Sequence, residues 1–305
     1  MSRNSLQNNT PLAGARMTRF IRDYSGWLFI LPSFVLFAFF IWEPMIYSVV
    51  MSFSKMQGFN IVGFAGLDNF KFVFSDNVFH IALKNTVTYV VLSMLIGYLV
   101  PIFLAIIVNE VAHGQRFFKV VVYFPALVPA VASLLMWKYI LDPSANGIIN
   151  GILSNLGIAP QGFYTVESMT IFWLILTMTW KSAGSTTMIY LASLQGINGE
   201  IYEAAELDGA GIIAKFRYIT IPGIYNTARL MLIMQIIAVF QIMYEPMVMT
   251  GGGPANASLS LILLSYRYAF ESSRPNYASV VGIVVTAILL LLTVIYLKFV
   301  KEQDA

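Results

Sequence analysis

The sequence predicts an all-α membrane protein with six transmembrane helices, and composition and hydropathy carry this prediction. Of the 305 residues, 58% are hydrophobic and only 11% are charged, at a mean hydropathy of +0.74. A soluble domain carries roughly 25% charged residues. Several apolar runs are also long enough to cross a bilayer, which takes about 20 residues each. The chain has no cysteine, which excludes a disulfide framework and thiolate metal sites.

Six apolar runs qualify as spans. A buried soluble helix could explain one such run but not six, so we interpret all of them as membrane helices. In order, they lie at about 27–53, 85–109, 118–140, 168–194, 224–248 and 278–300. The expected organisation is a tail at 1–26, a six-helix transmembrane domain at 27–300 and a short tail at 301–305.

The distribution of lysine and arginine predicts the orientation, because the cytoplasmic flanks of membrane helices are enriched in both. With the N-terminus inside, most basic residues fall on the side of the two tails and of the segment 198–224. The connection 141–167 contains neither lysine nor arginine. Both tails and 198–224 are therefore expected in the cytoplasm, and the connections at 54–84, 141–167 and 249–277 outside.

Prolines inside two of the runs predict kinks or helix ends, because proline removes a backbone donor. They are Pro32 and Pro44 in the first run, and Pro125 and Pro129 in the third. The connection 141–167 is rich in Gly, Pro and Asn, which predicts a loop with a short surface helix.

The segment 198–224 is the most informative part of the chain. It is polar, it lies between two apolar runs, and its acidic residues stand close together, namely Glu200, Glu203, Glu206 and Asp208. One interpretation is an ordinary solvated turn. The other is a surface that another protein grips, since small residues beside the acids would allow close approach.

Local helix signals indicate how this segment folds. Glu200 and Glu203 in a first helical turn would oppose the positive end of the helix dipole. Gly209 is placed to end that helix with a positive φ. A second short helix is expected from about Gly211 to Ile219, and Pro222 would then open the fifth span.

The residues of this segment resemble the EAA loop of permease subunits in binding-protein-dependent ABC importers. The matching positions are Glu203-Ala204-Ala205, Asp208-Gly209-Ala210, Phe216, Ile219, Ile221 and Pro222. The chain after its tail resembles the maltose-type carbohydrate-uptake group of that family. The stretches that match are GLDNF (66–70), Phe79 with Asn85-Thr86, PALVP (125–129) with Trp137, WKSAG (180–184), IYLASLQGI (189–197), MTGGGP (249–254) and NYASVVG (276–282).

The resemblance implies a type I ABC importer permease fold with a cytoplasmic coupling helix in 198–224. It implies that ATPase subunits would contact Glu203, Ala204, Ala205, Asp208, Gly209 and Ala210. It further implies a second homologous permease subunit, two ATPase subunits, an extracytoplasmic solute-binding protein and a bacterial or archaeal plasma membrane. The sequence has no G-x-x-x-x-G-K-[ST] loop. The chain is therefore expected to be non-catalytic and to bind no cofactor itself, with ATP and Mg on partner subunits. Its basic residues are scattered, which argues against a nucleic-acid partner.

Polar residues within the runs are candidates for a substrate path, because charged residues in membrane helices are costly. Thr177, Lys181 and Ser185 recur at four-residue spacing and share one helix face, and Trp180 lies beside them. The alternative is that Lys181 pairs with a carboxylate, such as Glu43 or Glu245, or with a carbonyl, and only holds helices together.

The fifth run adds a second group of path candidates. Gln241, Tyr244 and Glu245 offer amide, phenol and carboxylate groups to a polyhydroxyl ligand. After this run, the resemblance implies an outer gate near Thr250, Gly251, Gly252, Gly253 and Pro254, whereas the alternative is a plain helix stop.

The predicted function is a permease subunit of an ABC importer for a carbohydrate, in particular a di- or oligosaccharide. Two alternatives stay open: the same machine with a glycerol-3-phosphate or polyol cargo, and a secondary transporter. A membrane-embedded enzyme would need a catalytic cluster such as HExxH, and the sequence has none.

Overall fold

The computed structural model describes residues 27, 29–111 and 113–303, which are mostly helical. By their contacts the described residues fall into two compact units, the first ending at Met51 and the second beginning at Ser52. The predicted tail 1–26 and the last two residues of the predicted tail 301–305 lie outside the described residues.

A membrane-length helix, Phe29–Ser52, makes up most of the described part of the first unit, and its last residue already belongs to the second unit. It contains a π-helical segment, η1 (Ala38–Trp42), followed by α2 (Glu43–Ser52). The wide π turn ends two residues before Pro44, whose ring would clash with the preceding turn of a regular α-helix. Pro44 therefore widens the helix locally instead of ending it.

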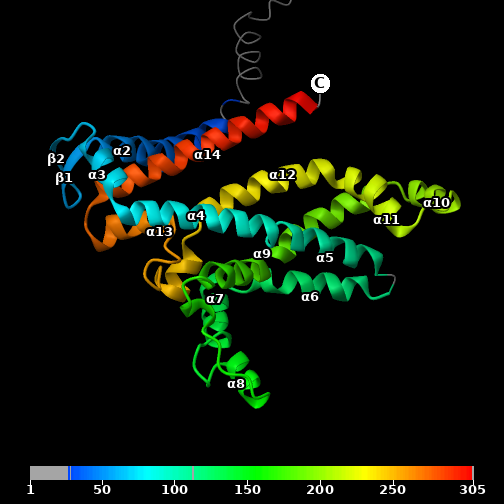
Figure 1. The fold of residues 1–305 in the computed structure, drawn as a ribbon. Helices are drawn as coiled ribbons and strands as arrows, with labels where there is room; N and C mark the ends of the chain where they lie inside the picture. The colour runs from blue at the N-terminus through cyan, green and yellow to red at the C-terminus, as the bar shows by residue number, and fades with distance from the viewer. Residues whose placement is uncertain (1–26, 28, 112, 304–305) are drawn as a thin grey trace, which may run out of the picture. The chain divides into compact units, whose positions relative to one another are not determined.

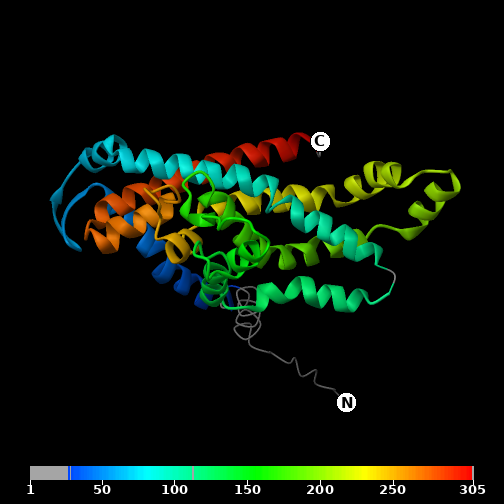
Figure 2. The ribbon, with the colours of Figure 1, turned by 60° about the horizontal axis from the view of Figure 1, so that its bottom comes forward.

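The second unit contains two strands and the remaining helices (Figures 1 and 2). In chain order they are β1 (Ser54–Gln57), β2 (Asn60–Phe64), α3 (Asp68–Ser75), α4 (Asn77–Leu95), α5 (Leu99–Glu110), α6 (Gln115–Leu127), α7 (Ala130–Ile140), α8 (Ile148–Asn155), η2 (Phe163–Thr165), α9 (Thr170–Gln195), α10 (Gly199–Leu207), α11 (Ile212–Lys215), η3 (Phe216–Thr220), α12 (Ile221–Phe240), η4 (Pro246–Thr250), α13 (Leu261–Tyr266), η5 (Arg267–Glu271) and α14 (Pro275–Gln303). α4, α9 and α12 pack against one another. Figure 1 shows α10 at one end of this bundle and α13 with the two strands at the opposite end.

The strands correct the all-α prediction in one detail. β1 and β2 form an antiparallel hairpin in which Ser54 pairs with Phe64. Gly58 makes the turn at a φ of +58°. A glycine followed by β-branched and aromatic residues is a hairpin signal, which the search for long apolar runs does not register.

The number of spans differs from the prediction. Among the described residues, four helices are long and apolar enough to cross a membrane: Phe29–Ser52, Asn77–Glu110, Ile212–Phe240 and Pro275–Lys298. A fifth span results if the bent pair α6 and α7 is counted as one. The membrane class is thus confirmed, but the number six is not.

The predicted fourth span, 168–194, corresponds to α9, which is not among those helices. α9 is long, with 26 residues, but it carries many threonines and serines. Several of these polar side chains, including Thr177, Thr179 and Thr187, are buried. Because neighbouring elements cover these threonines, α9 can carry polar residues that a fully lipid-facing helix would exclude.

Two other predicted spans are broken. The third, 118–140, turns by 97° between α6 and α7, where Pro129 caps α7, so the predicted break at that proline is confirmed. The fifth, 224–248, ends early, because α12 stops at Phe240. Pro246 has no N–H to continue the helix, and the carbonyl of Ile242 instead accepts a hydrogen bond from the Ser260 hydroxyl at 2.6 Å.

At its other end, the fifth span is longer than predicted. α11, η3 and α12 run on as one helix, Ile212–Phe240, without the expected break before Pro222. The π segment η3 ends two residues before Pro222, and its wider turn accommodates the proline ring. The connection after α7 contains the short helix α8, as predicted, and the Asn150 amide ties its loop together through the carbonyls of Asp142 and Gln161, each at 3.0 Å.

Candidate functional site

The insert, which we define as residues 198–224, begins with α10. Asn198 caps this helix, because its side-chain oxygen accepts a hydrogen bond from the Glu200 N–H at 3.1 Å. Such a cap satisfies one of the free donors of a first turn. Glu200 lies in that first turn, where its carboxylate opposes the helix dipole. The sequence predicts Glu203 in the first turn as well, but in the structure it lies in the second turn.

The end of α10 is a tight turn at Gly209. Gly209 has a φ of +78°. Its N–H donates to the carbonyl of Glu206 at 3.0 Å, and the N–H of Ala210 donates to the carbonyl of Ala205 at 2.8 Å. These two bonds define a Schellman motif, in which glycine takes the left-handed position. The prediction that Gly209 ends the helix is confirmed.

The tip of the insert exposes large apolar side chains. Leu207 is 90% exposed, Ile212 is 83% exposed and Ile213 is 82% exposed. The predicted coupling residues surround them: Glu203, Ala204, Asp208 and Gly209 are exposed, and Ala205 and Ala210 are half-buried. Apolar side chains rimmed by polar ones are typical of a protein interaction surface.

Only a few contacts tie α10 to the bundle. The hydroxyls of Tyr202 and Thr220 lie 3.0 Å apart, and the ammonium of Lys215 lies 3.8 Å from the Glu206 carboxylate. Beneath them, a cavity of about 450 Å³ is lined by residues of α5, α10, α11 and η3, including Asn109. α10 is therefore held by these individual side-chain contacts, and a cavity separates part of it from the bundle.

The glycine-rich loop, which we define as Thr250–Asn256, is fastened to α4. The Asn85 amide donates to the carbonyls of Asn256, at 2.7 Å, and Leu259, at 3.1 Å. The Thr86 hydroxyl accepts from the Leu261 N–H at 3.0 Å. The Asn85-Thr86 pair thus holds the chain that follows the loop against a spanning helix.

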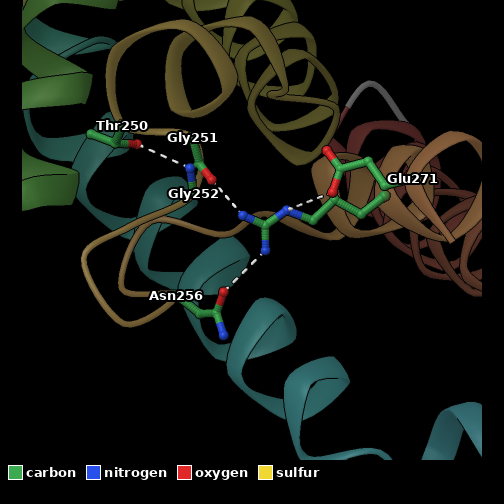
Figure 3. Close-up of polar contacts among 6 residues, drawn as sticks. Thr250, Gly251, Gly252, Asn256 and Glu271 are labelled. Carbon is green, nitrogen blue, oxygen red and sulfur yellow. Dashed lines mark hydrogen bonds and ion pairs between the residues drawn. The ribbon is translucent and has the colours of Figure 1, made fainter.

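Arg267 holds the same loop from its other side (Figure 3). Its guanidinium donates to the side-chain oxygen of Asn256 at 3.0 Å and to the carbonyl of Gly251. Its Nε lies 3.8 Å from the Glu271 carboxylate. A side chain at Gly252 would meet the guanidinium, because a Cβ there would lie 2.9 Å from it.

Sequence reasoning did not assign Arg267 to this site. The i, i+4 spacing of Arg267 and Glu271 predicts an ion pair on a helix. Nothing in the local sequence indicates that the guanidinium also reaches Gly251 and Asn256.

The segment after the loop is anchored by a buried phenol. The Tyr268 hydroxyl donates to the carboxylate of Asp76, and Asp76 also caps α4 by accepting from the Val78 N–H at 2.9 Å. Burial, together with the hydrogen bond to Asp76, raises the pKa of Tyr268 well above its ordinary value. The phenol therefore stays protonated and remains a donor at every physiological pH.

The predicted path residues of α9 face two different elements. Thr177 is buried, and its hydroxyl lies 3.6 Å from the sulfur of Met249 in η4. Lys181 donates to the carbonyl of Val128 at 2.5 Å, which lies between α6 and α7. Ser185 is exposed. A role of Lys181 and Ser185 on a substrate path stays a prediction.

The remaining path candidates lie on separate elements. Gln241 caps the end of α12, whereas Glu245 caps the start of η4. The prediction that both residues lie on one continuous helix is therefore wrong. Tyr244 is 56% exposed. The ring of Trp180 meets that of Trp137 edge-on, at 5.5 Å between centroids. The contacts of Thr177 and Lys181 thus lead to η4 and to the end of α6.

The chemistry of these groups suits hydroxyl-rich ligands. The Gln241 amide and the Glu245 carboxylate lie in the residues just before η4, and the Thr177 hydroxyl contacts Met249 within it. Among the described residues, no group of three or more His, Asp or Glu side chains is arranged to hold a metal ion.

Comparison with known proteins connects these features to transport. Residues 97–302 match the family model described as binding-protein-dependent transport system inner membrane component. The probable ABC transporter permease protein YurN of Bacillus subtilis (strain 168) is 32% identical over 280 residues, which cover 90% of this chain and 95% of YurN. The arabinooligosaccharides transport system permease protein AraP of the same organism is 29% identical over 288 residues, covering 94% of this chain and 91% of AraP.

Solved structures show the same fold. A bacterial ABC transporter involved in the import of the acidic polysaccharide alginate contains a chain with a TM-score of 0.84 and 27% identity, covering 94% of this chain and 99% of its own length. A structure of the bacterial alginate transporter in complex with an alginate pentasaccharide-bound periplasmic protein gives a TM-score of 0.82 at 27% identity, covering 92% and 96%.

Proposed function

The chain belongs to the family of binding-protein-dependent transport system inner membrane components, and we propose that it is one permease subunit of an ABC importer for a di- or oligosaccharide. The family consists of ABC transporter permease subunits, which are not themselves catalytic. Its relatives include sugar permeases, and its apolar helices fit a multi-pass plasma membrane protein. Family membership favours this importer over a secondary transporter.

The insert is the proposed contact with the ATPase subunits. The exposure of Leu207, Ile212 and Ile213 on an otherwise polar segment is the observation that carries this proposal. In water, such side chains gain free energy when a partner covers them, by about 25 cal/mol for each Å² of apolar surface buried. Glu203 and Asp208 would pair with basic or polar groups at the rim, while Ala204 would allow close approach.

The proposed orientation follows from this contact. The insert would face the cytoplasm, where ATP and Mg bind to the partner ATPases, and the glycine-rich loop would lie at the other membrane face. There an extracytoplasmic binding protein would deliver the sugar, and the loop would act as an outer gate. A second, homologous permease subunit would complete the path. The complex of the alginate transporter with its periplasmic protein supports this assembly by analogy.

The proposed cargo is a carbohydrate that meets the groups around η4. Gln241, Tyr244 and Glu245 would bind sugar hydroxyl groups, and the Tyr244 ring would stack on a sugar ring. A glycerol-3-phosphate or polyol-phosphate cargo would favour cations on the path. Lys181 is the cation among the predicted path residues, and its ammonium already donates to a backbone carbonyl, so a sugar fits better.

Two measurements test the proposal. We expect the full chain, co-expressed with its ATPase subunits, to retain them on purification, and Leu207→Asp to lose most of them. Leu156→Asp is the matched control, because Leu156 is also strongly exposed, at 70%, but lies in the connection after α8. Retention of the ATPases by Leu207→Asp would contradict the docking surface.

The cargo is tested with the reconstituted complex and a panel of sugars. One di- or oligosaccharide with its binding protein should stimulate ATP hydrolysis, and Glu245→Ala should reduce that stimulation. Stimulation by glycerol-3-phosphate, and by none of the sugars, would replace the proposed cargo with the alternative.

A further inference from the structure

The corner between α6 and α7 leaves a backbone carbonyl to be satisfied. Pro129 has no N–H, so the carbonyl of Pro125 accepts from the Val128 N–H at 3.2 Å instead. A new helix, α7, begins after this break, and the Ser133 N–H donates its hydrogen bond to the carbonyl of Pro129 at 3.0 Å. The carbonyl of Val128 lies between the two helices. In an apolar surrounding, such a group needs a partner from elsewhere in the protein.

Three residues of α9 contact this corner from one side. Lys181 donates to the carbonyl of Val128. Trp180 packs edge-on against Trp137 of α7. Gly184 meets α6 so closely that a Cβ on it would lie 2.1 Å from the carbonyl oxygen of Val122.

The contacts divide between the two arms and the apex of the corner. Gly184 touches α6, Trp180 touches α7, and Lys181 reaches the turn between them. Residues 180, 181 and 184 lie within about one turn of α9 and share a side of it. The WKSAG stretch (180–184) therefore contacts both arms of the corner, and Lys181 joins it to Val128 of the PALVP stretch (125–129).

The corner sets the position of α7, and α7 borders the glycine-rich loop. α7 contacts η4. Between them lies a cavity of about 340 Å³, lined by Lys138 of α7, by Tyr164 and by Thr250, Gly253 and Pro254 of the loop. Any change in the angle between α6 and α7 would move Lys138 relative to the loop.

We infer that Lys181 is a positioning residue, which holds the corner between α6 and α7 and thereby sets the opening beside the glycine-rich loop. Its ammonium donates a hydrogen bond to a carbonyl that the broken helix cannot satisfy, and the carbonyl dipole in turn stabilises the ammonium. The effect of Lys181 on transport rests on the proposed function. Its role in the geometry of the corner does not.

Spin labels can measure the corner directly, because the chain has no cysteine. Single cysteines at Val121 of α6 and Tyr139 of α7 would carry the labels, since both side chains are exposed, at 50% and 62%. The full-length chain with its co-purifying subunits is placed in lipid nanodiscs, and the distance between the labels is measured by pulsed electron resonance. Lys181→Met keeps the length of the side chain but removes the donor, whereas Lys181→Arg keeps a donor.

We expect Lys181→Met to shift and broaden the distance distribution and Lys181→Arg to restore it. Ser182→Met is the matched control, because Ser182 is a neighbouring exposed residue and should leave the distribution unchanged. If Lys181→Met cannot be recovered in folded form, Trp137→Ala removes the contact on the α7 side and should shift the distances as well. Distances identical to the wild type in these variants would overturn the inference.

Sugar uptake separates this inference from the proposed function. A positioning role predicts that Lys181→Met changes the KM for the loaded binding protein and that Lys181→Arg restores it. An unchanged KM together with a shifted corner would overturn the link to the opening. A wild-type complex without sugar uptake would refute the proposed function, while the distances would still decide the role of Lys181 at the corner.

Discussion

Replacing Gly184 by alanine should destabilise the protein, because α6 and α9 touch through this glycine. A Cβ on Gly184 would lie 2.1 Å from the Val122 carbonyl oxygen and 2.9 Å from the Tyr123 Cα. Both neighbours are backbone atoms, which cannot rotate away as a side chain could. The two helices would have to move apart.

The expected magnitude is the difference between two effects. Overpacking costs about 1–3 kcal/mol, and a contact with backbone places Gly184→Ala at the upper end of that range. Alanine regains about 1 kcal/mol of helix propensity over glycine. The free energy of unfolding should therefore fall by about 2 kcal/mol, which corresponds to a drop of roughly 4–8 °C in melting temperature.

Thermal unfolding of the purified full-length variants, followed by tryptophan fluorescence, measures this effect. Gly282→Ala in α14 is the matched control, because no atom lies within 4 Å of a Cβ at that position. It should melt at the wild-type temperature or above, since only the gain in helix propensity applies. If Gly184→Ala melts as high as this control, the close approach of α6 and α9 is refuted.

Three further substitutions test local geometry. Gly209→Ala should cost about 1–2 kcal/mol of α10 stability, since the left-handed φ at this position strains alanine. Hydrogen exchange of the α10 amides should accelerate, and it should accelerate less in Gly209→Asn. Unchanged exchange in Gly209→Ala would contradict the turn. Asn85→Ala removes the donor to the carbonyl of Asn256 and should cost about 1–3 kcal/mol; maleimide should label a single cysteine at Ala255 faster, and equal rates would argue against this anchor. Tyr268→Phe should cost about 1 kcal/mol at neutral pH. Because folding raises the pKa of Tyr268, its contribution is present below about pH 10 and is lost at higher pH; a stability difference from Tyr268→Phe that shrinks already between pH 6 and 9 would contradict this assignment.

Hydropathy predicted the helices that face an apolar surrounding, and it failed where neighbouring helices decide the structure. One side of α9 is buried against other helices and carries threonines, so its composition is not that of a lipid-facing span. The break at Pro129 was predictable, because the loss of a donor is local, but the angle of 97° depends on contacts from α9. The end of α12 at Phe240 was not predictable, since the hydroxyl that takes over the Ile242 carbonyl belongs to Ser260, 18 residues away.

The candidate site divides in the same way. The insert was predictable because its signals are local: Glu200 in the first turn of α10 and Gly209 at its end. The anchoring of the glycine-rich loop was not, because Asn85 and Asn256 lie 171 positions apart in the sequence. The sequence singled out the Asn85-Thr86 pair only by resemblance. The structure shows what the pair does: it binds the chain at and after the glycine-rich loop.

The length of the helix that follows the insert explains how a polar segment can be attached to a membrane span. Ile212–Phe240 has 29 residues, which at 1.5 Å per residue gives about 43 Å. The hydrocarbon core of a bilayer is about 30 Å thick, so about 13 Å of a helix crossing it upright must project beyond it. Lys215 and Arg217 occupy the first two turns of this helix, and these charges favour projection at that end. α10 is then joined, through the turn at Gly209, to a continuous helix and not to a flexible linker. A partner that grips the exposed Leu207 would therefore act on a rigid element, and the three-residue break after Phe240 is the first place where that movement could be absorbed before it reaches the glycine-rich loop.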